Sequence, residues 1–279
     1  MDFPNKWRDG VDPFSLKFNN FTLKEVLGYP HAGNDVFYGK GLYLGKEVEV
    51  IIKVNRQPGA DVFNEVETLK KIKLDKTPVI IDHDNECTYR VSLLLEGEKL
   101  SVILKDNKDH ESLEYMEEYG SMLGVIHSIR GDFPCVKDRK FFHIMDKEKL
   151  DKIGLFSLYQ YLVENEPKTK DVCFCHGDFH YANVLWKDHH ISGILDFELF
   201  GMGIREFDIA WAIINRPGQT FLNTFEEIEL FLKGYRKHAN YNYDYVIYYM
   251  ALVYSWFIFF GDDNYHEYVK GFLRKINAI

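Results

Sequence analysis

Three polar side chains that could act on a phosphoryl group lie between residues 178 and 196. Asp178 and Asn183 are separated by four residues, and Asp196 comes thirteen residues after Asn183. Because Mg²⁺ takes oxygen ligands and shares the remaining positions with water and phosphates, Asn183 and Asp196 are candidate metal ligands. Asp178, on the same loop as the amide, could accept the proton of an attacking hydroxyl group. The spacing therefore predicts metal-assisted transfer of a phosphoryl group.

Each of these side chains also has an ordinary structural explanation as a capping Asp or a bridging Asn. Their joint spacing, however, is that of the protein-kinase catalytic loop and the metal-binding Asp that follows it. Two other functions stay open at this point. One is a catalytically silent nucleotide-binding protein, and the other is a metal-dependent hydrolase that uses Asp178, His180 and Asp196.

The elements that must position these residues fall into two regions. Residues 35–54 read as two strands interrupted at Gly39–Gly41, and residues 61–73 carry apolar residues at helical spacing. Two more extended runs follow at 78–81 and 89–95. Further on, helical patterns surround a β-rich segment at 172–197; they cover residues 113–126, 147–164, 204–215, 219–238, 243–260 and 263–277. The pattern predicts an α+β fold with a β-rich region at 1–96 and a mainly helical region at 97–279.

The segments around the candidate residues resemble a known family. His176-Gly177-Asp178-Phe179-His180, Ile194-Leu195-Asp196-Phe197-Glu198 and Phe207-Asp208-Ile209-Ala210 are similar to the motifs of aminoglycoside phosphotransferases and choline kinase-like enzymes. The resemblance covers most of the chain and is strongest at residues 172–212. It implies a two-lobed, protein-kinase-like fold and an ATP- and Mg²⁺-dependent kinase for a small-molecule alcohol. No Ala-Pro-Glu segment follows Asp196, which disfavours a protein substrate.

The family's roles transfer to matching positions in this chain. The resemblance implies that Asp178 is the catalytic base and that Asn183 and Asp196 bind Mg²⁺. It also implies that His176 and Asp208 brace the catalytic loop. Tyr181-Ala182 and Glu198 replace residues common in relatives, but neither change removes a chemical group that the reaction needs.

The family also requires a strand Lys for the ATP phosphates and a helical Glu as its partner. Lys53 lies among β-branched residues on an expected strand, where a charge needs a partner. On the following helix, Glu65 falls within the apolar face, whereas Glu67 points away from it. The sequence therefore predicts a Lys53–Glu65 pair.

The remaining nucleotide contacts follow from the resemblance alone. It implies that Gly33 and Asn34 belong to the loop that covers ATP, and that adenine meets the backbone around Leu93 and Leu95. The glycines at 39–45 do not form a Walker A loop, because the gap is one residue too long and Glu47 replaces the required Ser or Thr.

Composition excludes several classes of function. The net charge is −9, and no block of Lys and Arg suggests nucleic-acid binding. The apolar run at residues 245–260 is shorter than a membrane span and predicts a buried core helix. Four irregularly spaced cysteines and the lack of a signal-like N-terminus favour a cytoplasmic protein with reduced thiols.

The acceptor is the least defined part of the prediction. Residues 97–279 carry a net charge of −7, which favours a cationic alcohol such as an aminoglycoside, choline or ethanolamine. Aromatic residues in this region, Trp211, Tyr248, Tyr254 and Trp256, could form a cage for a quaternary amine. Homoserine, methylthioribose, macrolides and fructosamines remain alternatives.

Overall fold

The computed structural model describes residues 10–30, 34–56 and 61–279 and divides into two compact units. The N-terminal unit runs to Gly97 and also includes 185–187 and 192–200; the C-terminal unit comprises 98–184, 188–191 and 201–279. The sequence pattern predicts one region over 97–279, which would include all of 185–200. Two hydrogen bonds join part of this segment to the rest of the N-terminal unit: Ser192 Oγ donates to the Glu96 carbonyl at 2.6 Å, and Ile194 N donates to the Lys76 carbonyl at 2.7 Å.

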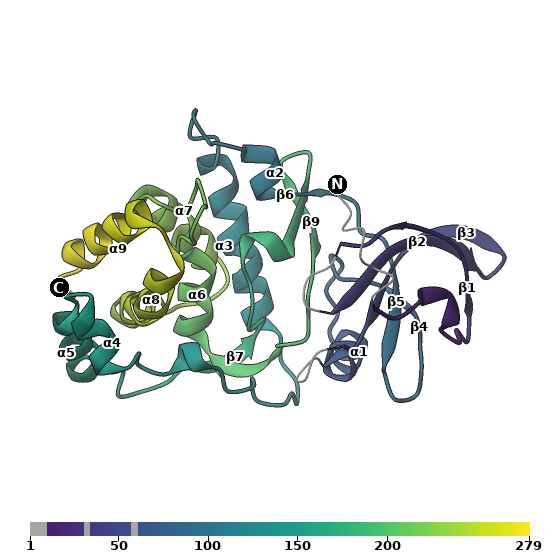
Figure 1. Ribbon diagram of the computed structural model, residues 1–279, viewed down its shortest axis with the longest axis horizontal. Helices are drawn as coiled ribbons and strands as arrows, with labels where there is room; N and C mark the ends of the chain where they lie inside the picture. Colours follow the sequence, from purple (N-terminus) through teal and green to yellow (C-terminus); the bar gives the residue numbers. More distant parts are fainter. Residues whose placement is uncertain (1–9, 31–33, 57–60) are drawn as a thin grey trace. The chain divides into compact units, whose positions relative to one another are not determined.

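The N-terminal unit is built on an antiparallel five-stranded sheet with the order β1-β2-β3-β5-β4 (Figure 1). Its strands are β1 (Phe21–Gly28), β2 (Asp35–Tyr43), β3 (Lys46–Val54), β4 (Ile80–His83) and β5 (Tyr89–Leu93). Phe37, Val50, Ile52 and Val91 are fully buried in its core. Alternating β-branched residues place Lys53 on the strand β3, next to this core.

Strand β2 continues through Gly39–Gly41, where the sequence suggested an interruption. A Cβ at Gly41 would lie 2.3 Å from the Thr22 carbonyl oxygen, and one at Gly39 would lie 2.9 Å from the Glu25 carbonyl oxygen. These glycines allow β1 to approach β2 closely, and sequence analysis missed β1 altogether. The hairpin turn lies instead at Leu44 and Gly45, which both have positive φ angles.

Helix α1 (Val62–Lys71) follows the expected pattern. Asp61 caps its N-terminus by accepting a hydrogen bond from Asn64 N at 2.8 Å. Glu65 and Val66 on its apolar face are fully buried, whereas the Glu67 side chain is 39% exposed and pairs with Lys70 at 2.9 Å. The helix therefore delivers one carboxylate, that of Glu65, into the interior of the N-terminal unit.

The C-terminal unit is mainly helical, as predicted. Its helices are α2 (Leu100–Leu104), α3 (Leu113–Ser128), α4 (Lys147–Lys152), α5 (Phe156–Glu164), α6 (Arg205–Ile213), α7 (Phe225–Tyr235), α8 (Tyr243–Phe257) and α9 (Asp263–Lys275). The remaining strands of the chain are β6 (Glu98–Lys99), β7 (Val172–Cys175), β8 (Val184–Lys187), β9 (His190–Ile194) and β10 (Gly201–Ile204), and most of β8 and β9 belongs to the N-terminal unit. The single helix expected at 147–164 is split into α4 and α5 around Gly154, which has a φ of 72°.

Helices α3 and α7 pack against each other at two glycines. A Cβ on Gly120 of α3 would lie 1.8 Å from the Phe231 carbonyl oxygen, and one on Gly234 of α7 would lie 1.9 Å from that of Glu117. Each glycine therefore faces the backbone of the other helix. This contact fixes α3, which carries His127 in its last turn.

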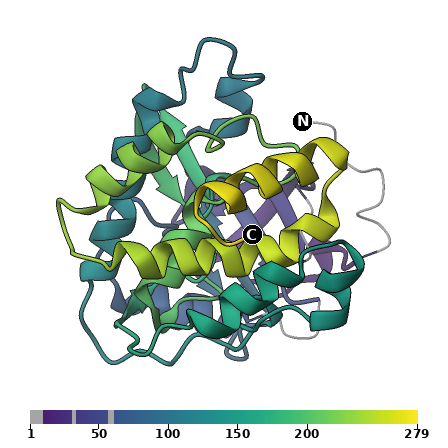
Figure 2. The same ribbon diagram turned by 90° about the vertical axis from the view of Figure 1, so that its left-hand side faces the viewer.

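The apolar run near the C-terminus forms α8 and the short 3₁₀ helix Ile258–Phe260 (Figure 2). Together they span 18 residues with a mean hydropathy of 1.2, enough by length and composition to cross a membrane. However, 61% of the segment is buried within the protein, including every residue from Val246 to Ser255. This burial is that of a core helix, in line with the prediction for 245–260.

Candidate active site

The loop between β7 and β8 carries Asp178 and Asn183 in direct contact. Asn183 Nδ2 donates to the backbone carbonyl of Asp178 at 3.0 Å and to its Oδ2 at 3.3 Å. Trp211 of α6 donates its indole N–H to Asp178 Oδ1 at 2.7 Å, and His180 Nε2 lies 3.6 Å from Oδ2. The carboxylate of Asp178 is thus fixed on both oxygens, with 22% of its side chain exposed.

The surroundings of Asp178 keep it ionised. Burial alone would raise its pKa, but the hydrogen bond and charge of His180, together with the charges of Arg139 and Arg216, lower it to about 2. At neutral pH the group is a carboxylate that can accept a hydrogen bond. A carboxylate of such low basicity is better suited to orienting a hydroxyl group through a hydrogen bond than to removing its proton.

Asp208 of α6 holds the start of this loop. Its carboxylate accepts hydrogen bonds from the backbone N–H groups of His176 at 2.9 Å and Gly177 at 3.0 Å. Gly177 has a φ of 80°, a conformation that favours glycine. The His176 ring is fully buried and its Nδ1 accepts from Asp178 N at 3.3 Å. Both residues therefore lie where the sequence-based prediction needs a brace.

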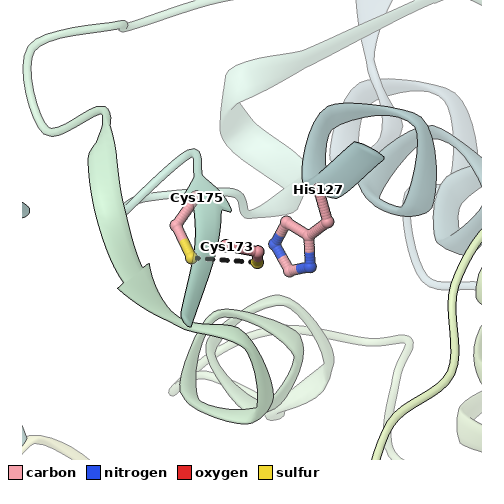
Figure 3. Close-up of side chains that lie close together, drawn as sticks. All are labelled: His127, Cys173 and Cys175. Carbon is pink, nitrogen blue, oxygen red and sulfur yellow. Dashed lines mark hydrogen bonds between the residues drawn. The ribbon is translucent and has the colours of Figure 1, made fainter. Parts of the chain in front are cut away.

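A histidine that sequence analysis missed extends this brace to α3. His127 Nε2 lies 3.0 Å from Asp208 Oδ2, and its Nδ1 lies 2.7 Å from the Tyr235 hydroxyl. Figure 3 shows its ring beside the sulfur atoms of Cys173 and Cys175, which are 3.7 Å apart on β7. The three possible ligand atoms lie within 4.8 Å of one another. A metal ion here would have to displace a hydrogen bond, because both ring nitrogens already have partners.

In the N-terminal unit, Lys53 is surrounded by carboxylates. Its Nζ lies 3.2 Å from Glu65 Oε2, 2.9 Å from Asp196 Oδ1 and 2.6 Å from Glu198 Oε1. Arg90 Nη2 contacts the other oxygen of Glu65 at 2.8 Å. The structure therefore pairs Lys53 with Glu65, as the position of Glu65 on the apolar face of the helix predicts. It also pairs Lys53 with Glu198, a contact that was not predicted.

The charges in this cluster stabilise one another. Burial alone would lower the pKa of Lys53, but the charges of Glu65 and Asp196 outweigh it and raise that pKa. Burial would raise the pKa of Glu65, whereas Arg90 and Lys53 lower it to about 2. Burial and the neighbouring carboxylates raise the pKa of Glu198, although Lys53 opposes them. Lys53 and Glu65 are both charged at neutral pH.

The two predicted metal ligands belong to different units, Asn183 to the C-terminal unit and Asp196 to the N-terminal unit. Asp196 has a φ of 62° and a side chain that is 42% exposed. Asn183 uses its amide N–H groups on Asp178, which leaves its carbonyl oxygen as the group suited to a cation. A carboxylate and an amide oxygen are the donor types that Mg²⁺ takes, so the donor atom of each residue, taken by itself, suits this ion.

Of the residues predicted to bind the nucleotide, only some have described contacts, and one of them joins the Lys53 cluster. Asn34 joins the Lys53 cluster, since its Nδ2 donates to Glu198 Oε1 at 2.6 Å. Leu93 ends β5, where its backbone N–H donates to the Val79 carbonyl at 3.0 Å, and Leu95 lies beside Gly193. Gly33 lies outside the described residues.

Comparison with known proteins assigns the family. Residues 45–241 match the sequence model of the phosphotransferase enzyme family, a span that includes Lys53, Asp178 and Asp196. The chain belongs to this family. The match confirms the predicted resemblance and identifies this phosphotransferase as a small-molecule kinase. No curated protein matches the chain significantly.

Solved structures confirm the predicted α+β, kinase-like fold for this phosphotransferase. The amicoumacin kinase hAmiN, solved with AMP-PNP, Ca²⁺ and Ami, has a TM-score of 0.57 at 14% identity, covering 93% of this chain and 90% of that one. Choline kinase LicA from Streptococcus pneumoniae gives 0.57 at 16% identity, with 95% of each chain covered. The gentamicin complex of APH(2")-IIa gives 0.56 at 15% identity, with 97% of each covered.

Proposed function

We propose that this phosphotransferase transfers the γ-phosphoryl group of ATP, with Mg²⁺, to a hydroxyl group of a small molecule. The observation that carries the proposal is Asp178, a carboxylate held ionised and fixed by Trp211 and Asn183. A similar structure solved with an ATP analogue and a divalent cation supports the choice of donor. The acceptor oxygen forms a bond to the γ-phosphorus while the bond to the bridging oxygen of ADP breaks, and the hydroxyl proton passes by way of the Asp178 carboxylate to solvent.

Asp178 accepts the hydrogen bond of the attacking hydroxyl in this proposal. Phosphoryl transfer passes through a loose transition state, so the hydroxyl proton leaves late and a strong base is unnecessary. A carboxylate with a pKa of about 2 suits this role, because it stays ionised and correctly oriented. The brace of His176 and Asp208 keeps the loop in place.

Asn183 and Asp196 would hold Mg²⁺, which neutralises charge on the phosphates when bound. Lys53 would bind the α- and β-phosphates, with Glu65 fixing its direction. Gly33, Asn34, Leu93 and Leu95 complete the proposed nucleotide site. The free thiols of all four cysteines support a cytoplasmic location.

The decisive experiment measures ADP release from Mg·ATP with a panel of alcohols: aminoglycosides, macrolides, choline, ethanolamine, homoserine, methylthioribose and fructosamines. Asp178→Asn should lower acceptor-dependent turnover at least ~100-fold, because the charged group that accepts the hydrogen bond of the attacking hydroxyl is lost. Asp138→Asn is the matched control, since Asp138 is 73% exposed and pairs only with His143 among the described residues. Equal turnover in Asp178→Asn and Asp138→Asn would refute the assignment of Asp178.

A second variant tests the metal ligand. Asp196→Asn removes a charge from the proposed Mg²⁺ site, so the Mg²⁺ concentration for half-maximal ADP release should rise. A titration curve identical to that of the wild type would count against Asp196. Binding of Mg·ATP without turnover for any acceptor would favour a silent nucleotide-binding protein, and turnover without nucleotide would favour a hydrolase.

A further inference from the structure

The side chains next to Asp178 carry positive charge. The guanidinium carbon of Arg139 lies 4.8 Å from the centre of the Trp211 ring, and that of Arg216 lies 5.2 Å from it. Trp211 itself donates to Asp178 at 2.7 Å. One aromatic ring therefore joins two arginines to the residue proposed to meet the acceptor.

Aromatic rings and carbonyl oxygens hold these arginines. Arg139 donates to the Gly177 carbonyl, and Arg216 Nη2 donates to that of Trp211 at 2.8 Å. Neither forms an ion pair within the described residues of the chain. The carboxylates that influence them are Asp178, which affects both, and Asp208, which affects Arg139 and is occupied by the loop backbone. Their positive charge is only partly balanced.

A third cation, Lys140, lies among further aromatic rings of the C-terminal unit. Lys140 is exposed, and its Nζ lies 5.0 Å from the Phe141 ring, 5.7 Å from that of Trp256 and 5.4 Å from that of Phe260. The Phe141 ring in turn lies 5.2 Å from that of Trp211. Apolar rings and three cations thus border the same part of the C-terminal unit.

These contacts argue against an aromatic cage for a cationic acceptor. The ring of Trp211 already meets Arg139 and Arg216, and the ring of Trp256 meets Lys140. Tyr248 and Tyr254 are buried in the core, 3% and 0% exposed. A further cation near Asp178 would therefore meet positive charges. The net charge of −7 that favoured a cation is an average over the whole region and does not describe this surface.

We infer that the acceptor is an alcohol that carries an anionic group, a carboxylate or a phosphate, on an apolar body. Arg139, Arg216 and Lys140 bind the anionic group, and the rings with exposed area, those of Phe141, Trp256 and Phe260, contact the body. Guanidinium groups suit this role because their planar N–H groups match carboxylate and phosphate oxygens. The inference rests on the proposed function, since it takes Asp178 as the residue that orients the acceptor hydroxyl.

The test uses one scaffold with different charges. Binding to the intact protein is measured by calorimetry for 4-(hydroxymethyl)benzoate, 4-(hydroxymethyl)phenyl phosphate, 4-(hydroxymethyl)benzamide and 4-(aminomethyl)benzyl alcohol. At least one anion should bind about tenfold or more tightly than the amide, the gain expected for a charge-assisted hydrogen bond, and the amine should bind most weakly. The two anions distinguish a carboxylate from a phosphate.

Substitutions show which side chains cause the preference for the anionic ligands. Arg139→Gln, Arg216→Gln and the exposed Lys140→Gln should each reduce the preference for the anion, and Arg216→Lys should restore part of it. Arg236→Gln is the matched control, because Arg236 also lies over an aromatic ring, 4.9 Å from that of Tyr241. It should leave the preference unchanged. Lys140→Gln changes an exposed side chain, so its result does not depend on core packing.

The inference is overturned if neither anion binds, if the amine binds most tightly, or if the preference for the anion survives in all three glutamine variants. Its outcome is separate from that of the proposed function. ADP release with a cationic alcohol alone would support the kinase and refute the anionic acceptor. Charge-selective binding without ADP release for any alcohol, anionic ones included, would support the binding surface and refute the proposed reaction.

Discussion

At the residue scale, the low pKa of Asp178 refines the role proposed for it. A carboxylate this weakly basic is expected to orient the acceptor hydroxyl rather than to remove its proton before the reaction. Sequence reasoning places a carboxylate at this position but says nothing of its basicity. His180, on the same loop, lowers that basicity most, the charges of Arg139 and Arg216 lower it further, and the indole of Trp211 fixes the orientation. Arg139, Trp211 and Arg216 come from segments more than thirty residues away along the chain. Local motifs could therefore identify Asp178, whereas its electrostatic environment required the structure.

The buried carboxylate of Glu65 has a large expected effect on stability. Glu65→Gln should destabilise the N-terminal unit by about 3 kcal/mol, because Lys53 and Arg90 lose the carboxylate that they share in a buried site. Glu67→Gln, two positions along the same helix, should change stability by less than ~1 kcal/mol, since its pair with Lys70 is exposed. Urea unfolding of the two variants gives the comparison, and equal losses would show that burial of the pair is unimportant.

At the element scale, glycines mark where backbones approach each other. Gly39 and Gly41 resemble turn residues in the sequence, yet they lie inside β2. They are glycines there because the neighbouring strand β1 packs against them at short range. That contact depends on a strand some twenty residues earlier, so local pattern could not indicate it. The long helices were predictable, since their apolar periodicity is strong. The split at Gly154 and the short elements α2, β6 and β10 were missed because they lack such a period.

The α3–α7 contact gives a sharp test of glycine packing. Gly120→Ala should destabilise the protein by ~3 kcal/mol or more, because its methyl group would overlap the Phe231 carbonyl and force the helices apart. Gly271→Ala in α9 is the matched control, since a Cβ there meets no atom within 4 Å. It should stabilise the protein by about 0.5–1 kcal/mol through helix propensity. Thermal unfolding measures both, and a neutral Gly120→Ala would mean that the helices can separate at little cost.

At the scale of the whole molecule, His127 links stability to pH. Burial alone would lower its pKa, but its hydrogen bonds to Asp208 and Cys173 outweigh that effect and raise it to about 9. A folded pKa above the unfolded value of ~6.5 means that the stabilisation is complete below pH 6.5 and is lost as pH rises through 9. The shift corresponds to a loss on the order of 3 kcal/mol.

His127→Gln should remove this part of the pH dependence. Urea unfolding at pH 6, 7.5 and 9 should show a smaller decline for His127→Gln than for the wild type. His143→Gln is the control, because His143 is exposed and pairs with the exposed Asp138. An unchanged slope in His127→Gln would exclude the buried imidazolium as its source.

The positions of the cysteines make the opening of each unit separately measurable by thiol chemistry. Cys87 is buried in the N-terminal unit, Cys173 and Cys175 are buried in the C-terminal unit, and Cys135 is exposed. An alkylating reagent should modify Cys135 at once and the others only when their unit opens, so the labelling rates report local opening free energies. Mass spectrometry of labelled peptides could thus show which unit a nucleotide or an acceptor holds closed, in the unmodified wild-type chain.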